Sequence, residues 1–400
     1  MGNAVTLIDY KATAILDVEV TWPSEVARHA ETFYVPLNVW RELDLLPPAI
    51  GRGLMGRPVG TRLQASYEPG ALVPVYDTAE SAQFPRDSFA SGQRTPRQGR
   101  FYPRAFLTGF AGNPLPFRCA DVHGSHFTAD FNHPLAGKML SLAITVQSVT
   151  PKRYEKGGEC QDWLDQILGN GPGMQARRPG KPTDFFADNP FARDDEQDDV
   201  WFYGEPRLVN HLDAQARATI QSLYARMLTP GMKVLDLMSS WQSHLPDQLP
   251  LTSVVGVGLN EAELQHNSRL TRHLIHDLNQ DPRMPFPDRE FDAVICSLSV
   301  EYLTRPEEVF QEVARILRPG GRLIHTFSNR WFPPKVIKIW PELHEFERLG
   351  LVLEYFLRSG SFGSLETFSC RGWPRPASDR YFPQVRLSDP VYAVWGEIQK

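Results

Sequence analysis

The sequence predicts two domains of different class: a mainly-β first half, and a second half that is an α/β domain on a mostly parallel sheet. Up to about residue 150, short stretches of alternating apolar and polar residues are separated by many prolines and glycines. From about residue 205, apolar strands alternate with segments of helical periodicity. A chain of 400 residues is also long for one hydrophobic core. We therefore expect domains at 1–150 and 205–400, joined by a linker at 151–204.

The composition is that of a globular protein and excludes several classes. Hydrophobic residues make up 42% and charged residues 22%, and no apolar run is long enough to cross a bilayer. The first residues lack the pattern of a signal peptide, so we expect a cytoplasmic protein. Cys119, Cys160, Cys296 and Cys370 are far apart and form no CxxC pair, which favours reduced thiols over disulfides or a metal site. The net charge of −5 gives no reason to expect nucleic-acid binding.

Strands of the first half are indicated by a period of two. Ala14–Val20 alternates apolar and polar residues, which is typical of a half-buried strand. The other expected strands are Thr32–Val39, Arg62–Tyr67, Phe117–Val122 and Met139–Val149. Glycines and prolines between residues 47 and 60 indicate tight loops with little helix, and prolines indicate further loops over 69–118. The prediction is a small, mostly antiparallel sheet that ends in a hairpin.

The segment DFNHPLAGK, Asp130–Lys138, lies between the last two of these strands. With the strand after it, this segment resembles the final hairpin of SlyD-like FKBP-type peptidyl-prolyl isomerases. LPPAIGRGLMGRPVGTRLQASYEPG and RFYPRAFLTG are similar to earlier parts of that family, so the resemblance covers about residues 12–150. It implies an FKBP-like fold, a proline-containing polypeptide as partner, and isomerase activity in an apolar, aromatic-lined pocket. A dry site is needed because rotation of the prolyl amide has a barrier of about 18–20 kcal/mol.

The residues of this half also fit a structural alternative. Asn132, His133 and Pro134 suit a turn whose side chains cap backbone groups. The family's pocket acid and tyrosine have no assigned position, and the nearby aromatic residues fit a core as well as a pocket. These aromatic residues are Tyr34, Trp40, Tyr67, Tyr76 and Phe84.

The expected linker contains GNGPGMQARRPGKPTD and the acidic run Asp194–Asp199. The run lacks the alternating ligands and central glycine of a calcium loop, so we interpret it as solvated linker. Trp201, Phe202 and Tyr203 follow it and are expected to dock the linker on the second domain.

Strands and helices alternate through the second half. Helices are expected at His211–Leu228, Glu261–Leu270 and Pro306–Leu317, where apolar residues recur at helical spacing. Seven strands are expected at Val234–Leu237, Ser253–Val257, Leu274–Ile275, Phe291–Cys296, Arg322–Phe327, Leu351–Tyr355 and Pro390–Trp395.

Three segments in a fixed order, VLDLMSSWQSHLP, PFPDREFDAVICSLSVEYL and LRPGGRLIHTF, give a second resemblance. Over about residues 200–400 the chain closely resembles the Rossmann-like class I S-adenosylmethionine-dependent methyltransferases. The resemblance implies S-adenosylmethionine as cofactor, at the carboxyl end of the first strand and against the amino terminus of the next helix. The implied cofactor-binding residues are the strand-end acid Asp236, the turn residues Met238, Ser239, Ser240 and Trp241, the ribose-side residues Gly258, Asn260 and Glu261, the adenine-side residues Asp277 and Leu278, and Ser297 on the substrate side.

Two positions depart from the family's pattern. The turn has no glycine, so Cβ atoms stand where backbone approaches the ligand, and the ribose acid is replaced by Gly258. Each lost charge-assisted hydrogen bond costs about 1.5–3 kcal/mol, or roughly ten- to hundredfold in affinity. Either the site is degenerate, or Ser239, Ser240 and Trp241 supply replacement contacts.

No catalytic residue can be named, which is compatible with methyl transfer because in-line positioning is its main requirement. His244, His276 and His325 suit a cleft but also structural roles. Arg330 and Lys335 suit either an anionic substrate or a solvated helix start. The segment after the fourth strand lacks the NPPY-like motif of base-flipping enzymes, so methylation of nucleobases is not expected.

Three hypotheses remain for the function. In the first, the protein is a methyltransferase, and the first domain engages its unidentified small-molecule or protein substrate. In the second, it is a peptidyl-prolyl isomerase or chaperone whose second half is a degenerate binding module. In the third, it is a scaffold without activity. We favour the first because the ordered segments and Asp277 are retained.

Overall fold

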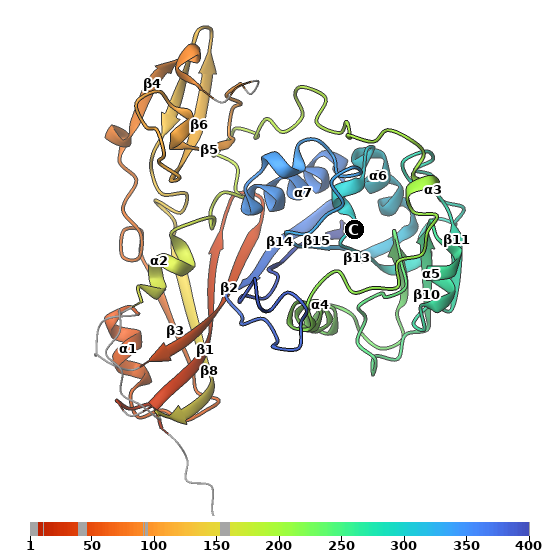
Figure 1. Cartoon of the computed structure of the whole chain (residues 1–400), viewed down its shortest axis with the longest axis horizontal. Coiled ribbons are helices and arrows are strands. Elements are labelled where there is room, and N and C mark those ends of the chain that lie inside the picture. Colours follow the sequence, from red (N-terminus) through yellow and green to blue (C-terminus); the bar gives the residue numbers. More distant parts are fainter. Residues whose placement is uncertain are drawn as a thin grey trace, which may run out of the picture. The chain divides into compact units, whose positions relative to one another are not determined.

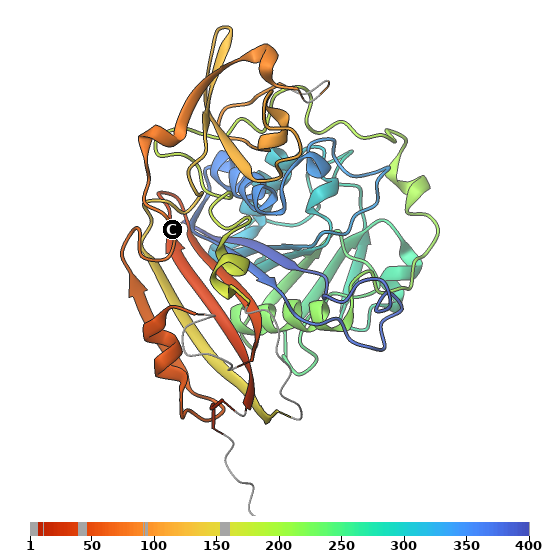
Figure 2. The same cartoon turned by 60° about the vertical axis from the view of Figure 1, so that its left-hand side comes forward.

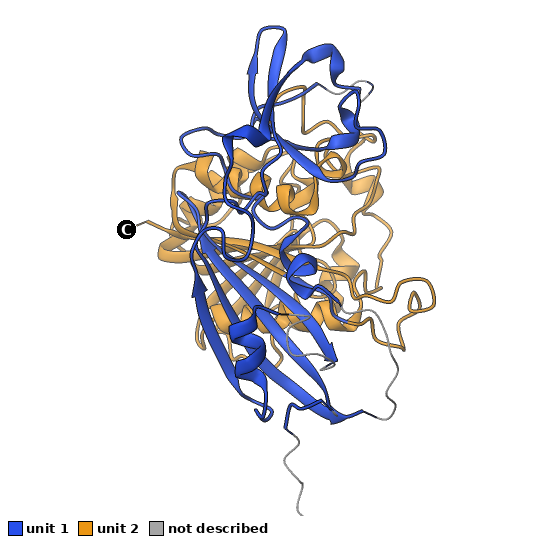
Figure 3. Cartoon of the chain, turned by 90° about the vertical axis from the view of Figure 1, so that its left-hand side faces the viewer, with its two compact units in different colours: residues 1–185, 370–373 blue, residues 186–369, 374–400 orange. Residues whose placement is uncertain are grey.

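The computed structural model describes residues 7–10, 12–38, 46–90, 92, 95–152 and 161–399. The chain folds into two compact units, which Figure 3 shows in different colours. Unit 1 comprises residues 1–185 and 370–373, and unit 2 comprises residues 186–369 and 374–400. The expected linker at 151–204 is therefore divided between the two units. Trp40 and Cys160 lie outside the described residues, whereas Cys119, Cys296 and Cys370 are buried.

The first sheet of unit 1 contains long antiparallel strands. Its strands are β1 (Ala12–Pro23), β2 (Arg28–Asn38), β3 (Arg62–Tyr67) and β8 (Leu140–Pro151), in the order β2-β1-β8-β3. Ala14, Leu16, Val18 and Val20 of β1 are fully buried and their neighbours are not, as the alternating pattern predicts. The strands expected in this part of the sequence are confirmed over their described residues.

A second, smaller sheet of unit 1 has the order β4-β7-β6-β5. Its strands are β4 (Ser81–Pro85), β5 (Phe101–Pro103), β6 (Pro116–His123) and β7 (His126–Asp130), and Figures 1 and 2 show them apart from the long strands. The predicted final hairpin is wrong, because β6 pairs with β7 and Asp130–Lys138 then connects this sheet to β8. Phe89, Tyr102, Phe117 and Phe127 form the aromatic core of the small sheet. β4 and β5 are too short to show a clear period of two, so the sequence analysis missed them and predicted loops over 69–118.

Two helices of unit 1 stand where loops or linker were expected. Helix α1 (Pro48–Leu54) begins with a proline in its first turn and buries Ile50 and Leu54, one turn apart, despite its glycines. Helix α2 (Trp163–Leu168) buries Trp163, Ile167 and Leu168 in the core that β1, β2 and β8 share. Residues beyond 151 therefore contribute to the core of unit 1.

Unit 2 contains a mixed sheet. Its strands are β9 (Lys233–Leu237), β10 (Ser253–Gly258), β11 (Arg272–Ile275), β12 (Phe291–Ser297), β13 (Leu317–Phe327), β14 (Phe362–Arg371) and β15 (Val391–Ile398). The last two residues of β14 belong to unit 1. The strand order is β11-β10-β9-β12-β13-β15-β14. From β11 to β13 neighbouring strands are parallel, and β15 is antiparallel to β13. The parallel part agrees with the predicted α/β class.

Helices cover both faces of this sheet. Helix α4 (Ala214–Met227) lies on the face opposite α6 (Pro306–Ile316) and α7 (Glu345–Ser359), as Figure 1 shows. The short helices are α3 (Asp199–Phe202) and α5 (Glu261–His266). The strand predicted at Leu351–Tyr355 is wrong, because these residues belong to α7. Residues 346–356 are all buried, so no polar face reveals the helical period. None of the described helices has the length and apolar character needed to cross a membrane.

Candidate functional site

A pocket lies at the carboxyl ends of β9, β10 and β12. β10 pairs with one edge of β9 and β12 with the other, so the order of strands in the sheet reverses at β9. Such a reversal of strand order is where open α/β sheets bind ligands. Ten of the predicted cofactor-binding residues line the pocket, and the eleventh, Glu261, does not. The ten are Asp236, Met238, Ser239, Ser240, Trp241, Gly258, Asn260, Asp277, Leu278 and Ser297.

Side chains hold the turn that follows β9. The Ser239 hydroxyl donates to the buried carboxylate of Asp236 at 2.6 Å, and the Ser239 amide donates to the Val257 carbonyl at 2.7 Å. The Asn267 amide group donates to the Ser240 carbonyl at 2.8 Å and to the Ser243 hydroxyl at 2.9 Å. The serines thus form side-chain hydrogen bonds in a turn that has no glycine.

No helix follows this turn directly. Residues 238–252, all of which the structure describes, contain no helix, and the next helix along the chain is α5. Serine hydroxyls compete for local polar groups, and Pro246 and Pro250 each lack an amide donor for a helical bond. Met238 has a left-handed backbone with φ 53°, a conformation that costs a non-glycine residue about 1–2 kcal/mol. Tertiary packing therefore stabilises this turn, without a helix dipole.

Gly258, at the position of the missing ribose acid, packs directly against the turn. A Cβ atom added to Gly258 would lie 2.3 Å from the Ser239 carbonyl oxygen, which is far inside van der Waals contact. An acid therefore cannot occupy this position while the Ser239–Val257 hydrogen bond is in place. The departure from the family's pattern follows from the close packing of the turn on β10.

Asn260 and Glu261 were the predicted ribose-side residues after β10, and the structure adds a third polar residue, Glu263. Asn260 caps α5: its oxygen accepts from the Glu263 amide at 3.0 Å, and its amide group donates to the Tyr203 carbonyl at 2.7 Å. Glu261 is exposed and contacts His273 at 2.9 Å. Glu263, which the sequence analysis missed, lines the pocket and accepts from the Ser240 hydroxyl at 2.5 Å. Its place three residues after a capping Asn is the signal that identifies it.

Asp277 and Leu278 form another side of the pocket. One oxygen of Asp277, Oδ1, accepts from the Asn279 amide at 2.9 Å, and Oδ2 has no hydrogen bond among the described residues. Leu278 is buried and apolar. The pair therefore presents a hydrogen-bond acceptor next to an apolar surface.

Aromatic rings line a further part of the pocket. The Tyr302 and Phe332 rings stack with centroids 6.0 Å apart, and the ring of Tyr203 lies 6.4 Å from that of Phe332. The Arg207 guanidinium lies 5.3 Å from the Phe332 ring centroid, and its Nη1 is buried without a hydrogen bond among the described residues. Trp201, expected to dock with its neighbours, is 79% exposed. The pocket therefore combines aromatic faces with a positive charge.

Two cations considered for an anionic substrate are engaged elsewhere. Lys335 is fully buried, and its Nζ lies 3.1 Å from Asp195 and 3.2 Å from Asp199. Asp199 is itself buried, so its interpretation as solvated linker is wrong. Arg330 donates to Asp389 at 3.0 Å. Both cations are occupied by acids that are distant in sequence.

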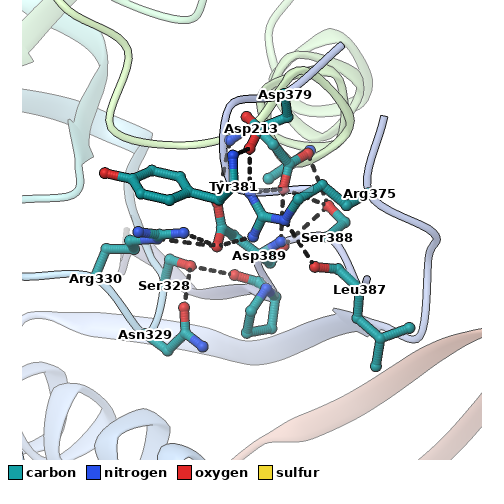
Figure 4. A network of polar contacts seen from close by, with 12 residues as sticks. Asp213, Ser328, Asn329, Arg330, Arg375, Asp379, Tyr381, Leu387, Ser388 and Asp389 are labelled. Carbon is teal, nitrogen blue, oxygen red and sulfur yellow. Dashed lines mark hydrogen bonds and ion pairs between the residues drawn. The ribbon is translucent and has the colours of Figure 1, made fainter. Parts of the chain in front are cut away.

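Asp389 is the centre of the network shown in Figure 4. It accepts from Arg375 at 2.6 Å and from the Asp213 amide at 3.1 Å, in addition to Arg330. Asp213 in turn caps α4 and accepts from the Ser388 hydroxyl at 2.9 Å. The network thus connects the residues that precede α4 with those that follow β13. Both segments contribute pocket residues, Leu212 and Phe332 among them.

The histidines provide no clear catalytic base. His325 is fully buried in β13 outside the pocket and stacks on Phe310, and burial lowers its pKa to about 3. His244 lines the pocket, and burial lowers its pKa to about 4. His276 also lines the pocket, where its Nε2 lies 2.8 Å from the Asp281 carbonyl. His325 and His244 are therefore neutral at pH 7.

We expect Asp236 to make stability depend on pH. Burial raises its pKa to about 6, against the opposing effect of the Ser239 and Ser243 hydrogen bonds. The folded state then binds more protons than the unfolded state between about pH 4 and 6, so the contribution of Asp236 to the free energy of unfolding is fully present below that range. It is lost as the pH rises, by up to about 3 kcal/mol. Urea unfolding from pH 4 to 7 checks this, with Asp236→Asn as reference. A difference between the two proteins that does not vary with pH would contradict it.

One protein family matches part of the sequence that forms this pocket. Residues 239–325 match the family described as "Methyltransferase domain". The matched residues lie within unit 2. The match supports S-adenosylmethionine as the cofactor of this domain, and the resemblance seen in its sequence segments is confirmed at that level.

Among curated proteins, the chain is similar to two quinone methyltransferases. It is 34% identical over 137 residues to the ubiquinone/menaquinone biosynthesis C-methyltransferase of Laribacter hongkongensis, covering 31% of this chain and 53% of that protein. It is 31% identical over 109 residues to the demethylmenaquinone methyltransferase of Beutenbergia cavernae, covering 27% and 44%. The chain thus spans about half the length of the curated relatives it matches. Among solved structures, an S-adenosylmethionine-dependent methyltransferase from Mesorhizobium loti is 16% identical with a TM-score of 0.30, over 44% of this chain and 96% of that one.

Proposed function

We propose that the protein transfers a methyl group from S-adenosylmethionine, with the pocket at the ends of β9 and β10 as its active site. The observation that supports this most is the turn after β9. Its serines bond to Asp236 and Glu263, so side chains replace the missing glycines in holding a defined turn beside the pocket. Of the two interpretations of the altered turn, this geometry favours replacement over decay.

The lining residues fit the parts of this cofactor. Oδ2 of Asp277 suits the amino edge of adenine, and Leu278 suits its face. Glu263 is the acid best placed for the ribose hydroxyls, because it lines the pocket, whereas Glu261 lies outside the lining and is directed to His273. The Glu263 oxygens also accept from the Ser240 hydroxyl and the Arg207 amide. We assign the turn residues Met238, Ser239, Ser240 and Trp241, with Gly258, to the methionine side.

We propose a small planar acceptor against the aromatic rings. The bound cofactor supplies an electrophilic methyl group, and the pocket's residues orient the acceptor and exclude water. Tyr203, Tyr302 and Phe332 offer faces for stacking, and Arg207 favours an acceptor with a negative charge or an oxygen substituent. The names of the two relatives, which concern quinones, support a ring-bearing small molecule as the class.

Replacing Glu263 by Gln is expected to weaken binding of S-adenosylmethionine about tenfold, because a charge-assisted hydrogen bond is lost. Glu261→Gln is the matched control on the same helix, and its affinity should equal that of the wild type. Isothermal titration calorimetry measures both. Absence of heat for the wild type at millimolar cofactor would reject the proposed function, whereas equal affinities of the two variants would reject only the role of Glu263.

The isomerase activity of unit 1 stays a prediction. The side chains of Asn132 and His133 bond to backbone groups, as the structural alternative predicts: Asn132 contacts Asp77, and His133 contacts Leu135 and Leu168. The pocket beside them has several charged side chains, which does not favour a dry site for a prolyl amide.

A further inference from the structure

A short turn after β12 contains both pocket residues and a buried acid. The turn η4 (Val300–Tyr302) is a single 3₁₀ turn, and Ser299 and Tyr302 on either side of it line the pocket of unit 2. Glu301 lies between them, outside the pocket lining, and its side chain is fully buried. Neither of its carboxyl oxygens has a hydrogen bond to another residue of the described chain. A carboxylate without partners in such a place is highly unfavourable, so the fold favours the neutral acid.

One cation lies near Glu301 without pairing with it. The Arg348 Nε donates to the Trp340 carbonyl at 3.0 Å, and the Arg348 guanidinium lies 4.5 Å from the Trp331 ring centroid. Two acids of its own helix also act on Arg348, namely Glu345 and Glu347. Burial raises the pKa of Glu301 to about 8, while its own amide and Arg348 act in the opposite direction. Glu301 is therefore mostly protonated at pH 7.

Three further titratable groups of the described chain lie near Glu301, and none of them carries a positive charge. They are the Cys296 thiol and the hydroxyl groups of Tyr203 and Tyr302. The Tyr203 hydroxyl is buried and has no hydrogen-bond partner among the described residues, whereas the Tyr302 hydroxyl accepts from the Phe332 amide at 2.9 Å. When Glu301 loses its proton, its carboxylate faces only these neutral groups and a distant guanidinium. It must then move toward water or toward a donor.

Hydrogen bonds connect this turn to two sides of the pocket. The Tyr302 carbonyl accepts from the Asn279 side chain at 3.0 Å, and the Asn279 backbone amide donates to Asp277 at 2.9 Å. On the other side, the Tyr302 hydroxyl holds the backbone of Phe332. A displacement of the turn therefore reaches Asp277, which we assign to adenine, and Phe332, which we assign to the acceptor.

We propose that Glu301 is a positioning residue for this pocket: its neutral carboxyl group keeps the turn Val300–Tyr302 in place, and its ionisation at alkaline pH displaces the turn and weakens cofactor binding. This inference rests on the proposed function. Because Glu301 lies outside the lining, it acts through Tyr302 and Asn279 and not by contact with the ligand. The turn is the two-state element, and the proton on Glu301 decides which state is populated.

The test is the affinity for S-adenosylhomocysteine, the demethylated cofactor, measured by calorimetry on the full-length protein from pH 6 to pH 9. Relative to Glu301→Gln, the wild type should bind about tenfold more weakly at pH 9 than at pH 7. The reason is that a group that titrates near pH 8 leaves about a tenth of the protein in the competent state at pH 9. Ionisation of the ligand or of Asp236 affects both proteins alike and cancels in this ratio.

Two further variants complete the test. Glu301→Met is a second neutral variant of similar length, and its pH dependence should match that of Glu301→Gln. Glu307→Gln removes a half-exposed acid of α6 outside the pocket lining, so it should keep the pH dependence of the wild type. Circular dichroism at each pH shows that all the proteins are folded.

Urea unfolding gives a measurement that needs no ligand. The folded state binds one proton more than the unfolded state between about pH 5 and 8, because the pKa of Glu301 is raised on folding. Its contribution to stability is thus fully present below that range and is lost as the pH rises through about 8. The unfolding constant of the wild type, relative to that of Glu301→Gln, should increase about tenfold per pH unit over that range and then level off.

Affinities of the folded wild type and Glu301→Gln that keep a constant ratio from pH 6 to 9 would overturn the inference. A ratio of unfolding constants that does not change with pH would also overturn it, because Glu301 would then be ionised in the folded protein. A wild type that binds no S-adenosylhomocysteine at pH 7 would instead reject the proposed function, and the unfolding constants would still show whether Glu301 is neutral.

Discussion

Replacing Gly258 by Ala is expected to reduce the free energy of unfolding by about 3 kcal/mol and to weaken S-adenosylmethionine binding at least tenfold. The added Cβ would lie 2.3 Å from the Ser239 carbonyl oxygen, which is backbone and cannot rotate away. The turn must then leave β10, and Ser239 loses its hydrogen bond to Val257. Urea denaturation and calorimetry measure the two effects.

Gly53→Ala is the matched control for this substitution. Gly53 lies in α1, where a Cβ would lie 3.2 Å from the end of the flexible Leu63 side chain. Alanine favours a helix by about 0.8–1 kcal/mol over glycine, so this variant should be at least as stable as the wild type. Unchanged stability and affinity of Gly258→Ala would show that the turn does not pack on β10 as described.

Replacing Asp389 by Ala is expected to cost about 3–5 kcal/mol of stability, because it leaves the buried Arg375 without its main acid. The Arg375 side chain is 1% exposed and that of Asp389 is 4% exposed. Arg375 keeps weaker contacts with Asp213 at 3.5 Å and Asp379 at 3.1 Å, which cannot replace the 2.6 Å contact with Asp389. The unfolding midpoint in urea at pH 7 tests this.

The control for Asp389→Ala is another ion pair of unit 2. Glu307 contacts Arg358 at 3.2 Å, and both side chains are about half exposed. Exposed pairs contribute about 0–1 kcal/mol, so Glu307→Ala should change the midpoint little. Similar losses for the two variants would mean that burial does not set the strength of the network in Figure 4.

The elements that sequence predicted well share a local cause. Phe291–Cys296 is an apolar run of strand length, and β12 spans Phe291–Ser297. Arg62–Tyr67 was predicted with the bounds that β3 has. Such patterns depend on burial of residues close in sequence, so they can be read without the fold. The strand predicted at Leu351–Tyr355 was wrong because a helix that is buried on all sides shows neither the helical period nor the period of two.

The candidate site shows the same limit at the level of single residues. The strand ends placed Asp236, Gly258, Asp277 and Ser297 near one another, since parallel strands end at one edge of the sheet. Glu263 lines the pocket instead of the predicted Glu261. Which of the two faces the pocket depends on the orientation of the first turn of α5, which Asn260 caps. A difference of two residues reverses the direction of a helical side chain, and propensity does not resolve that.

The sequence by itself determined that the second half is an α/β domain with a ligand pocket after Asp236, because strand and helix periods and the order of the segments are local properties. Tertiary structure alone decided how the turn without glycines is held, and which acids and cations meet. The Asp213 amide donates to Asp389, which is 176 residues away in the sequence. Lys335 and Asp199 are also distant in the sequence, yet both are buried and their charged atoms lie 3.2 Å apart. Buried charges are tolerated only when paired, so such partners are selected by packing across the fold rather than by their neighbours in sequence.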